Sequence, residues 1–292
     1  MTINYYRADD PFAMSQDMIA SYHRDGVLVI EDMICNEDCQ SLMQRMHQLV
    51  EQFDVDEHRS VFSAVTNEQK DDSYFLESGG EIRYFFEKDA FDEAGQLVVD
   101  KHLSLNKVGH ALHDLDPVFN QFSRQQKFNQ VVSALGMAEP RLLQSMYIFK
   151  HPRIGGEVNC HQDAPFLWTE PQSCIGLWFA LEDATLDNGC MWGIPGQHKE
   201  SRPRGRLSRV AENQTEYEVF DESGWPEEMK QPLAVKAGTM VVLHGQFPHL
   251  SGPNTSDKSR HAYVLHLIDG RCNYPQSNWL QRSSDFPISG FD

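Results

Sequence analysis

The sequence predicts an α+β fold, in which a double-sheet β-roll carries helices on its outside. Helical periodicity dominates roughly the first 140 residues. From about residue 141 to residue 270, short runs rich in β-branched, aromatic and aliphatic residues alternate with turn signals. Helices followed by a series of strands are typical of this class. No repeat or low-complexity linker interrupts the chain, so we expect a single domain over residues 1–292.

Three helices are predicted in the first part. Residues 15–25 are expected to form one, with Ser15 as its N-cap and Gly26 just past its end. Asn36 is expected to cap a second helix. The apolar stripe of this second helix consists of Leu42, Met46, Leu49, Val50 and Phe53. A third helix is expected from about residue 123 to residue 136.

Strand patterns dominate the second part of the chain. The predicted strands cover residues 142–150, 174–182, 190–194, 238–244 and 260–267. Turn signals such as Gly155-Gly156 and Pro195-Gly196 separate them. Residues 202–228 contain four arginines followed by an acidic run, which indicates a long insertion between two strands.

The charge balance is strongly acidic, with 25 Lys+Arg against 43 Asp+Glu and a formal net charge of −18. Nucleic acids and anionic membranes require a basic surface, so neither is expected as a partner. A small-molecule substrate remains compatible with this charge. Residues 51–100 hold 14 acidic and 4 basic residues without sustained periodicity. We interpret them as a solvated, partly irregular segment, with an acidic partner surface as the alternative.

The compartment is predicted from features that are missing. The first residues have no basic flank followed by an apolar run, and no stretch approaches the roughly 18 apolar residues of a membrane span. Six scattered cysteines without a C-x-x-C pair are typical of reduced thiols. A cytoplasmic protein is therefore expected, and a monomer is favoured although the oligomeric state is open.

The strongest candidate for chemistry is His161-Gln162-Asp163. In an extended segment residues i and i+2 point to the same face, so both side chains can contact one ion. Two imidazoles and one carboxylate on one face of an octahedron bind Fe(II) and leave positions open for O2 and a bidentate cosubstrate. With 13 His and 23 Asp in the chain, chance alone supplies about one H-x-D, so the spacing by itself is weak.

Sequence context distinguishes this motif from a second copy of the spacing. His23 and Asp25 lie at the end of a predicted helix, where side chains at i and i+2 diverge, so no metal role is expected there. His161 instead precedes a strand pattern, and His249 offers a further ligand downstream. Arg260 follows His249 by eleven residues. Its permanent charge near a metal implies an anionic ligand.

Two further histidine arrangements compete with this site. His110 and His113 are spaced i, i+3, and a zinc site there would need Asp114 and Asp116 as further ligands. His244 is an alternative to His249 as the distal ligand of the main candidate.

Long segments are more specific than the H-x-D spacing. They run from residues 22–27 to residues 278–280 and include 82–88, 106–112, 144–150, 155–158 and 182–190. In these segments the sequence resembles the phytanoyl-CoA dioxygenase family of Fe(II)/2-oxoglutarate-dependent oxygenases. The resemblance implies a double-stranded β-helix, a jelly-roll of the cupin-like type, with flanking helices.

The resemblance also implies roles for individual residues. His161, Asp163 and His249 become the iron ligands through which catalysis acts, in preference to His244. Arg260 is expected to bind the distal carboxylate of 2-oxoglutarate, with Ser251 as a second hydrogen-bond donor.

Other positions are implied to line the cosubstrate pocket. They are Lys107, Met146 and Trp178, which without the resemblance would be interpreted as structural. Tyr147 and Gln162 are weaker candidates for the same pocket.

The function implied by the resemblance is that of a dioxygenase using Fe(II), 2-oxoglutarate and O2. Such an enzyme couples oxidative decarboxylation of 2-oxoglutarate to succinate and CO2 with hydroxylation of a small organic substrate. Halogenating relatives have a small residue at the position of Asp163, so the carboxylate here favours hydroxylation. One alternative is a sensor or binding protein that holds iron and 2-oxoglutarate without a second substrate. Another is a structural protein whose histidines are incidental. The substrates of the family are diverse, so the primary substrate is not predicted.

Overall fold

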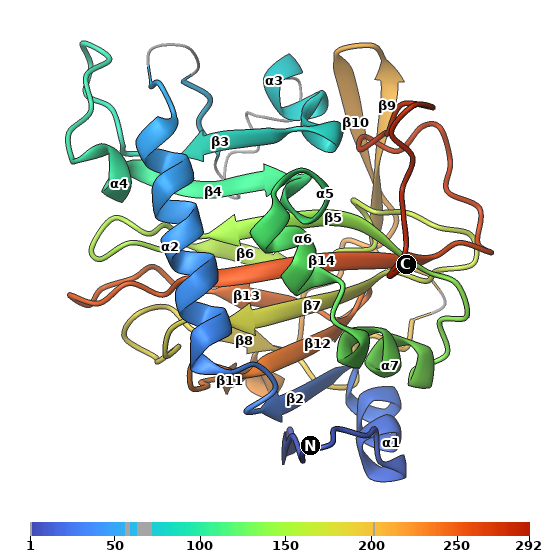
Figure 1. Cartoon of the computed structure of the whole chain (residues 1–292). Helices are drawn as coiled ribbons and strands as arrows, with labels where there is room; N and C mark the ends of the chain where they lie inside the picture. Colours follow the sequence, from blue (N-terminus) through green and yellow to red (C-terminus); the bar gives the residue numbers. More distant parts are fainter. Residues whose placement is uncertain (1, 56–58, 63–71, 201) are drawn as a thin grey trace.

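Two β-sheets face each other, and helices cover the outer face of the larger one (Figure 1). The computed structural model describes residues 2–55, 59–62, 72–200 and 202–292. The larger sheet has the order β1 (Tyr5–Arg7), β2 (Val27–Glu31), β12 (Met240–His244), β7 (Ile175–Ala180), β14 (Ala262–Asp269), β5 (Pro140–Ile148), β4 (Leu105–His110) and β3 (Ile82–Phe86). The smaller sheet has the order β11 (Gln231–Leu233), β8 (Met191–Gly193), β13 (His249–Ser251) and β6 (Val158–His161). The predicted double-sheet β-roll of the α+β class is confirmed.

The helices are short except for one that crosses the larger sheet. They are α1 (Gln16–Asp25), α2 (Asn36–Gln52), α3 (Ser73–Leu76), α4 (Lys101–Ser104), α5 (Leu112–Leu115), α6 (Pro117–Ser123) and α7 (Gln126–Ala134), with 3-10 turns η2 (Ser78–Gly80) and η3 (Glu227–Met229). In Figure 1, α2 runs over the face of the larger sheet that lies opposite the smaller sheet. Among the described residues, no helix combines the length and apolarity needed to cross a bilayer.

The core has two layers, one on each face of the larger sheet. Successive side chains of a strand point to opposite faces, so fully buried strands supply both layers. In β14, Tyr263 and Leu265 pack in the outer layer with helices α2, α6 and α7, whereas Ala262 and Val264 pack between the two sheets. Trp178 of β7 belongs to this inner layer. The inner layer adjoins the candidate site.

The predicted helices are only partly confirmed. Ser15 caps α1 by accepting a hydrogen bond from the Met18 N–H, and Gly26 ends the helix with a left-handed φ of 79°. The predicted cap Asn36 is wrong by one residue, because the Cys35 side chain occupies the cap position of α2. The predicted third helix is confirmed as α7, with its ends shifted inward, and the separate helix α6 precedes it from the Asp116 cap.

The predicted division into a helical part before residue 140 and a β-core after it needs correction. All five predicted strands are present with shifted ends, but β1, β2, β3 and β4 come from the first part of the chain and form half of the larger sheet. Tertiary burial overrides the weak local signals there. The interpretation of residues 51–100 as irregular is wrong for β3, where Phe85 and Phe86 are fully buried. Residues 56–58 and 63–71 of this segment lie outside the described residues.

The insertion at residues 202–228 contains a two-stranded antiparallel hairpin, β9 (Gly205–Ala211) and β10 (Gln214–Val219). It lies in the chain between β8 and β11, as predicted for an insertion between strands. The Arg204 guanidinium stacks over the Trp225 ring at 3.4 Å. Arg204 also pairs with Glu200 at 2.7 Å, and these contacts anchor the base of the hairpin.

Candidate active site

The smaller sheet brings the three predicted metal ligands together. His161 ends β6 and His249 begins β13, and the two residues lie directly opposite each other in the antiparallel ladder. Asp163 follows β6, and its Oδ1 lies 3.6 Å from His161 Nε2 and 3.8 Å from His249 Nε2. One ligand atom from each residue lies within 4.8 Å of the others. His244 is not part of this group, because it ends β12 beside His198.

Backbone carbonyls fix the orientation of both imidazoles. The Nδ1 of His161 lies 2.8 Å from the Asn159 carbonyl oxygen, and the Nδ1 of His249 lies 3.0 Å from that of Phe247. Each Nδ1–H is therefore assigned as the donor to its carbonyl, which leaves the Nε2 lone pair free. Such partners are typical of histidines that bind a metal.

Charge states at neutral pH suit a divalent cation. Burial, with the neighbouring His249, lowers the pKa of His161 to about 4, so its imidazole is neutral. Burial also opposes ionisation of Asp163. Attraction to His249, His266 and His161 outweighs burial and holds the pKa of the Asp163 carboxyl well below its ordinary value. Metal binding requires these states, a neutral imidazole and an ionised carboxylate.

His266 is a site residue that the sequence analysis missed. It lies in β14, 4% exposed, and its Nε2 is 3.2 Å from Asp163 Oδ2. This contact engages one carboxylate oxygen, while the other faces the two candidate ligand histidines. The alternation of side chains along β14 is a signal that could have predicted this position. Residues i and i+2 of a strand point to the same face, so His266 shares the inner face with Val264.

Arg260 is a buried cation with free donors. It is 4% exposed, and its Nε and Nη1 have no hydrogen-bond partner within the part of the chain that the structure describes. Burial lowers the pKa of Arg260 to about 10, so the guanidinium stays charged at neutral pH. It lies over Trp178, 5.5 Å from the ring centroid. A buried charge without a partner is costly, so this arrangement fits an anionic ligand such as the carboxylate of 2-oxoglutarate.

A buried lysine beside Arg260 was also missed. Lys150 is 3% exposed, and its Nζ donates hydrogen bonds to Ser251 Oγ at 2.9 Å and to the Gly156 carbonyl at 2.7 Å. Its own carbonyl accepts a hydrogen bond from the Arg260 N–H at 3.2 Å. Because the Ser251 oxygen accepts from Lys150, its hydroxyl proton is free to donate to a ligand. Local sequence does not distinguish this lysine from an exposed one after a strand.

The other predicted pocket residues lie on the inner face of the larger sheet. Trp178 and Met146 both pair with Val264, so the three form one row across β7, β14 and β5. Lys107 of β4 is 6% exposed and reaches toward Met146, with Nζ 3.9 Å from the sulfur. Its Nζ also lies 3.3 Å from the centroid of the Phe62 ring. Burial lowers the pKa of Lys107 to about 7.

Two weaker pocket candidates have structural roles instead. Tyr147 points to the outer layer, where its hydroxyl lies 2.7 Å from His261 Nδ1. Gln162 uses its amide to tie loops together, donating to the Gln246 carbonyl and accepting from the Arg204 N–H. Neither side chain is available to the cosubstrate.

The alternative zinc site is not formed. His110 bonds to Ser78 and His113 bonds to Ser145. The carboxylates are used elsewhere: Asp114 pairs with Arg124 and Arg282, and Asp116 caps α6. His23 and Asp25 also form no site, because Asp25 pairs with Arg24.

Comparison with known proteins identifies similar sequences over nearly the whole chain. A sequence model of the family described as "Phytanoyl-CoA dioxygenase (PhyH)" matches residues 22–262. The chain is 44% identical over 274 residues to "Phytanoyl-CoA dioxygenase" of Arabidopsis thaliana, a match that covers 93% of this chain and 95% of the relative. It is 41% identical over 279 residues to "Phytanoyl-CoA dioxygenase domain-containing protein 1" of Danio rerio, a match that covers 92% of this chain and 96% of the relative.

Solved structures share the fold at low sequence identity. The non-heme α-ketoglutarate-dependent carbocyclase SnoK from nogalamycin biosynthesis matches with a TM-score of 0.64 and 17% identity, covering 94% of this chain and 96% of that one. EctD from S. alaskensis with bound Fe matches with a TM-score of 0.63 and 17% identity, and the match covers 92% of this chain and 82% of the EctD chain. These structures confirm the predicted jelly-roll core with flanking helices.

Proposed function

The chain belongs to the phytanoyl-CoA dioxygenase family, and from this premise we propose that it hydroxylates a small organic substrate. Members of this family are 2-oxoglutarate-dependent oxygenases that use Fe(II), 2-oxoglutarate and O2, and the chain has a His-Asp-His group for the metal. The single observation that carries the proposal is the convergence of His161, Asp163 and His249 within 4.8 Å of one another. Iron bound there would supply the oxidising chemistry, with 2-oxoglutarate as the electron donor.

The protein's own contribution is to hold the metal and keep the ligand set in one arrangement. His161 and His249 offer Nε2 because their Nδ1 atoms are engaged by backbone carbonyls. Asp163 offers Oδ1, while His266 orients its other oxygen. A carboxylate as the third ligand leaves no room for a halide at that position, which supports hydroxylation.

The cosubstrate is proposed to bind along the inner face of the larger sheet. Arg260 would bind the distal carboxylate through Nε and Nη1, and Ser251 would donate its hydroxyl proton. Lys150 positions the Ser251 oxygen. The remaining wall consists of Lys107, Met146 and Trp178.

Succinate formation tests this proposal. Protein loaded with Fe(II) and 2-oxoglutarate under anaerobic conditions, then exposed to O2, is expected to form succinate. The rate should rise when a panel of small organic acids, thioesters and amino-acid derivatives includes the true substrate. A His249→Ala variant is the control and should form none.

If the wild-type protein forms no succinate under any condition, the enzyme proposal is wrong. Binding without any acceleration by substrates would favour the sensor alternative.

Binding of 2-oxoglutarate is expected to take up protons at pH 8. Burial lowers the pKa of Lys107 to about 7, and burial with the charge of Arg260 lowers that of Lys150 to about 7. Both amines are therefore mostly neutral in the free protein above pH 7, and a bound dianion raises their pKa. Calorimetry in two buffers of different ionisation enthalpy should show close to two protons taken up per ligand.

A single substitution measures the contribution of Lys107 to this proton uptake. Lys107→Met is expected to lower the uptake by about one proton. Lys236→Met is the control, because Lys236 is exposed and pairs with Asp183 on the surface. An unchanged proton uptake in Lys107→Met would exclude Lys107 from the pocket.

The predicted cytoplasmic location and the favoured monomer stay predictions of the sequence. So does the small-molecule nature of the substrate, which the solved structures support by analogy: one similar structure, the epimerase SnoN, holds Fe3+, α-ketoglutarate and nogalamycin RO.

A further inference from the structure

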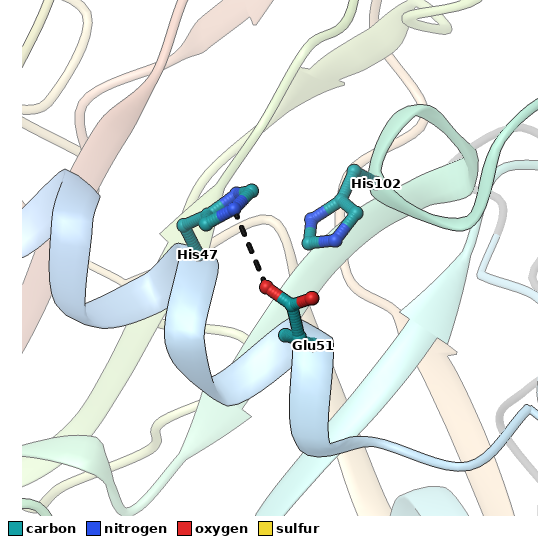
Figure 2. Close-up of side chains that lie close together, drawn as sticks. All are labelled: His47, Glu51 and His102. Carbon is teal, nitrogen blue, oxygen red and sulfur yellow. Dashed lines mark ion pairs between the residues drawn. The ribbon is translucent and has the colours of Figure 1, made fainter.

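A second group of metal-ligating side chains lies on the outer side of the larger sheet. It consists of His47 and Glu51 of α2 and His102 of α4, each offering one ligand atom within 4.8 Å of the others. Figure 2 shows the three side chains gathered above the ribbon. We propose that this group, the outer triad, binds a divalent transition-metal ion such as Zn²⁺, independently of the catalytic iron.

The helix presents two of the three ligands together. His47 and Glu51 are four residues apart in α2, so their side chains project from successive turns on the same face. His47 Nε2 lies 3.6 Å from Glu51 Oε2, the ion pair drawn in Figure 2. This distance is close to the ligand spacing around one small cation.

Side chains of the two preceding residues hold the backbone of the third ligand, His102, in place. The Asp100 side chain accepts a hydrogen bond from the His102 N–H at 2.8 Å. Lys101 Nζ donates to the Glu51 and Phe53 carbonyls, each at 3.0 Å, and so fastens α4 to the end of α2. The His102 ring then stacks on that of His47, with centroids 4.3 Å apart. The Lys101 ammonium is engaged by carbonyls, so it does not compete for the Glu51 carboxylate.

The donor set selects the class of cation. Two imidazole nitrogens and one carboxylate oxygen suit Zn²⁺ and its neighbours, whereas Ca²⁺ and Mg²⁺ prefer oxygen ligands throughout. The ligand atoms must draw closer than 4.8 Å to reach Zn–ligand distances of about 2.1 Å. The His47 and Glu51 side chains are 62% and 70% exposed, so they can turn without disturbing the core. The same exposure makes this site weaker than the buried catalytic triad.

The outer triad borders a cavity that is lined by both polar and apolar side chains. His47 and His102 line a cavity of about 550 Å³ that also contains His151 and His261. His151 is 3% exposed, and its Nε2 has no partner among the described residues. A buried nitrogen of this kind is expected to bond to water, and waters in the same cavity would be available to complete the coordination of an ion at the outer triad.

Zn²⁺ stoichiometry tests the proposal. Competition with a chromophoric chelator should show two equivalents for the wild-type protein. The variant His161→Ala/Asp163→Ala removes two catalytic ligands and should keep one equivalent. His47→Ala should also keep one, at the catalytic triad, and combining all three substitutions should leave none. In the catalytic-site variant, Zn²⁺ should raise the melting temperature, and His47→Ala should abolish that shift because the ion joins α2 to α4.

Matched variants make the outcome specific. Glu51→Gln keeps the size of the side chain and should weaken the outer equivalent at least tenfold. His23→Ala removes another exposed helical histidine and should match the wild type. The proposal is overturned if His47→Ala binds as much Zn²⁺ as the wild type, or if the catalytic-site variant binds none. Loss of an equivalent in His23→Ala would also overturn it.

Discussion

Replacing Asp163 by alanine is expected to abolish Fe(II) binding at the catalytic triad and, with it, succinate formation. Substituting a residue that only supports a ligand typically costs about 10- to 100-fold in metal affinity, so losing a direct ligand should cost more than about 100-fold. The substitution also removes the only carboxylate among the three clustered side chains. Two imidazoles then remain, without a carboxylate to balance the charge of the cation.

Anaerobic titration with Fe(II), followed by the absorption of the iron–2-oxoglutarate complex, measures this effect. Asp163→Asn is the matched variant, because it keeps the shape and the contact with His266 while removing the charge. Asp257→Ala is the control, since Asp257 is exposed and pairs with Arg153 on the surface. Wild-type iron affinity in Asp163→Ala would disprove the ligand assignment.

How much of this site the sequence could predict depends on the range of each interaction. The relation between His161 and Asp163 is local, because the alternation of an extended chain puts i and i+2 on one face. The position of His249 opposite His161 is a matter of strand register, which no local pattern in the chain fixes. Only the resemblance to a family selected His249 over His244.

The residues that were missed owe their roles to burial by distant parts of the chain. Lys150 is buried because β13 lies against it, through the hydrogen bond to Ser251. Strand β3 was missed because the many acidic residues around it made the segment look solvated, although Phe85 and Phe86 are buried. By contrast, the opposite directions of Met146 and Tyr147 follow from alternation once one of them is placed.

The buried guanidinium of Arg260 stands out against the charge of the whole chain. The chain is acidic, with a formal net charge of −18, yet Arg260 is buried and its Nε and Nη1 have no hydrogen-bond partner among the described residues. Burying such a charge destabilises the free protein. A dianionic ligand relieves that cost, so binding of 2-oxoglutarate should stabilise the fold.

Replacing Arg260 by leucine is accordingly expected to weaken 2-oxoglutarate binding while sparing the ligand-free fold. Removing one partner of a buried, hydrogen-bonded charge pair costs about 2–5 kcal/mol, which corresponds to a loss of affinity of about 30-fold or more. The ligand-free protein loses an unpaired buried charge and gains apolar packing against Trp178. Its melting temperature should therefore stay the same or rise. Calorimetric titration and thermal unfolding measure the two effects.

Weaker 2-oxoglutarate binding together with an unchanged or higher melting temperature would identify Arg260 as a ligand-binding residue. A residue that only supported the fold would lower the melting temperature when replaced, and ligand affinity would fall with it. Arg260→Lys keeps the charge but loses the forked donor geometry, so its affinity should lie between those of the wild type and the leucine variant. Arg153→Leu, at an exposed arginine paired with Asp257, should leave ligand affinity unchanged. If Arg260→Leu binds 2-oxoglutarate as tightly as the wild type, the free donors of Arg260 serve another ligand, and the cosubstrate must lie elsewhere on the inner face.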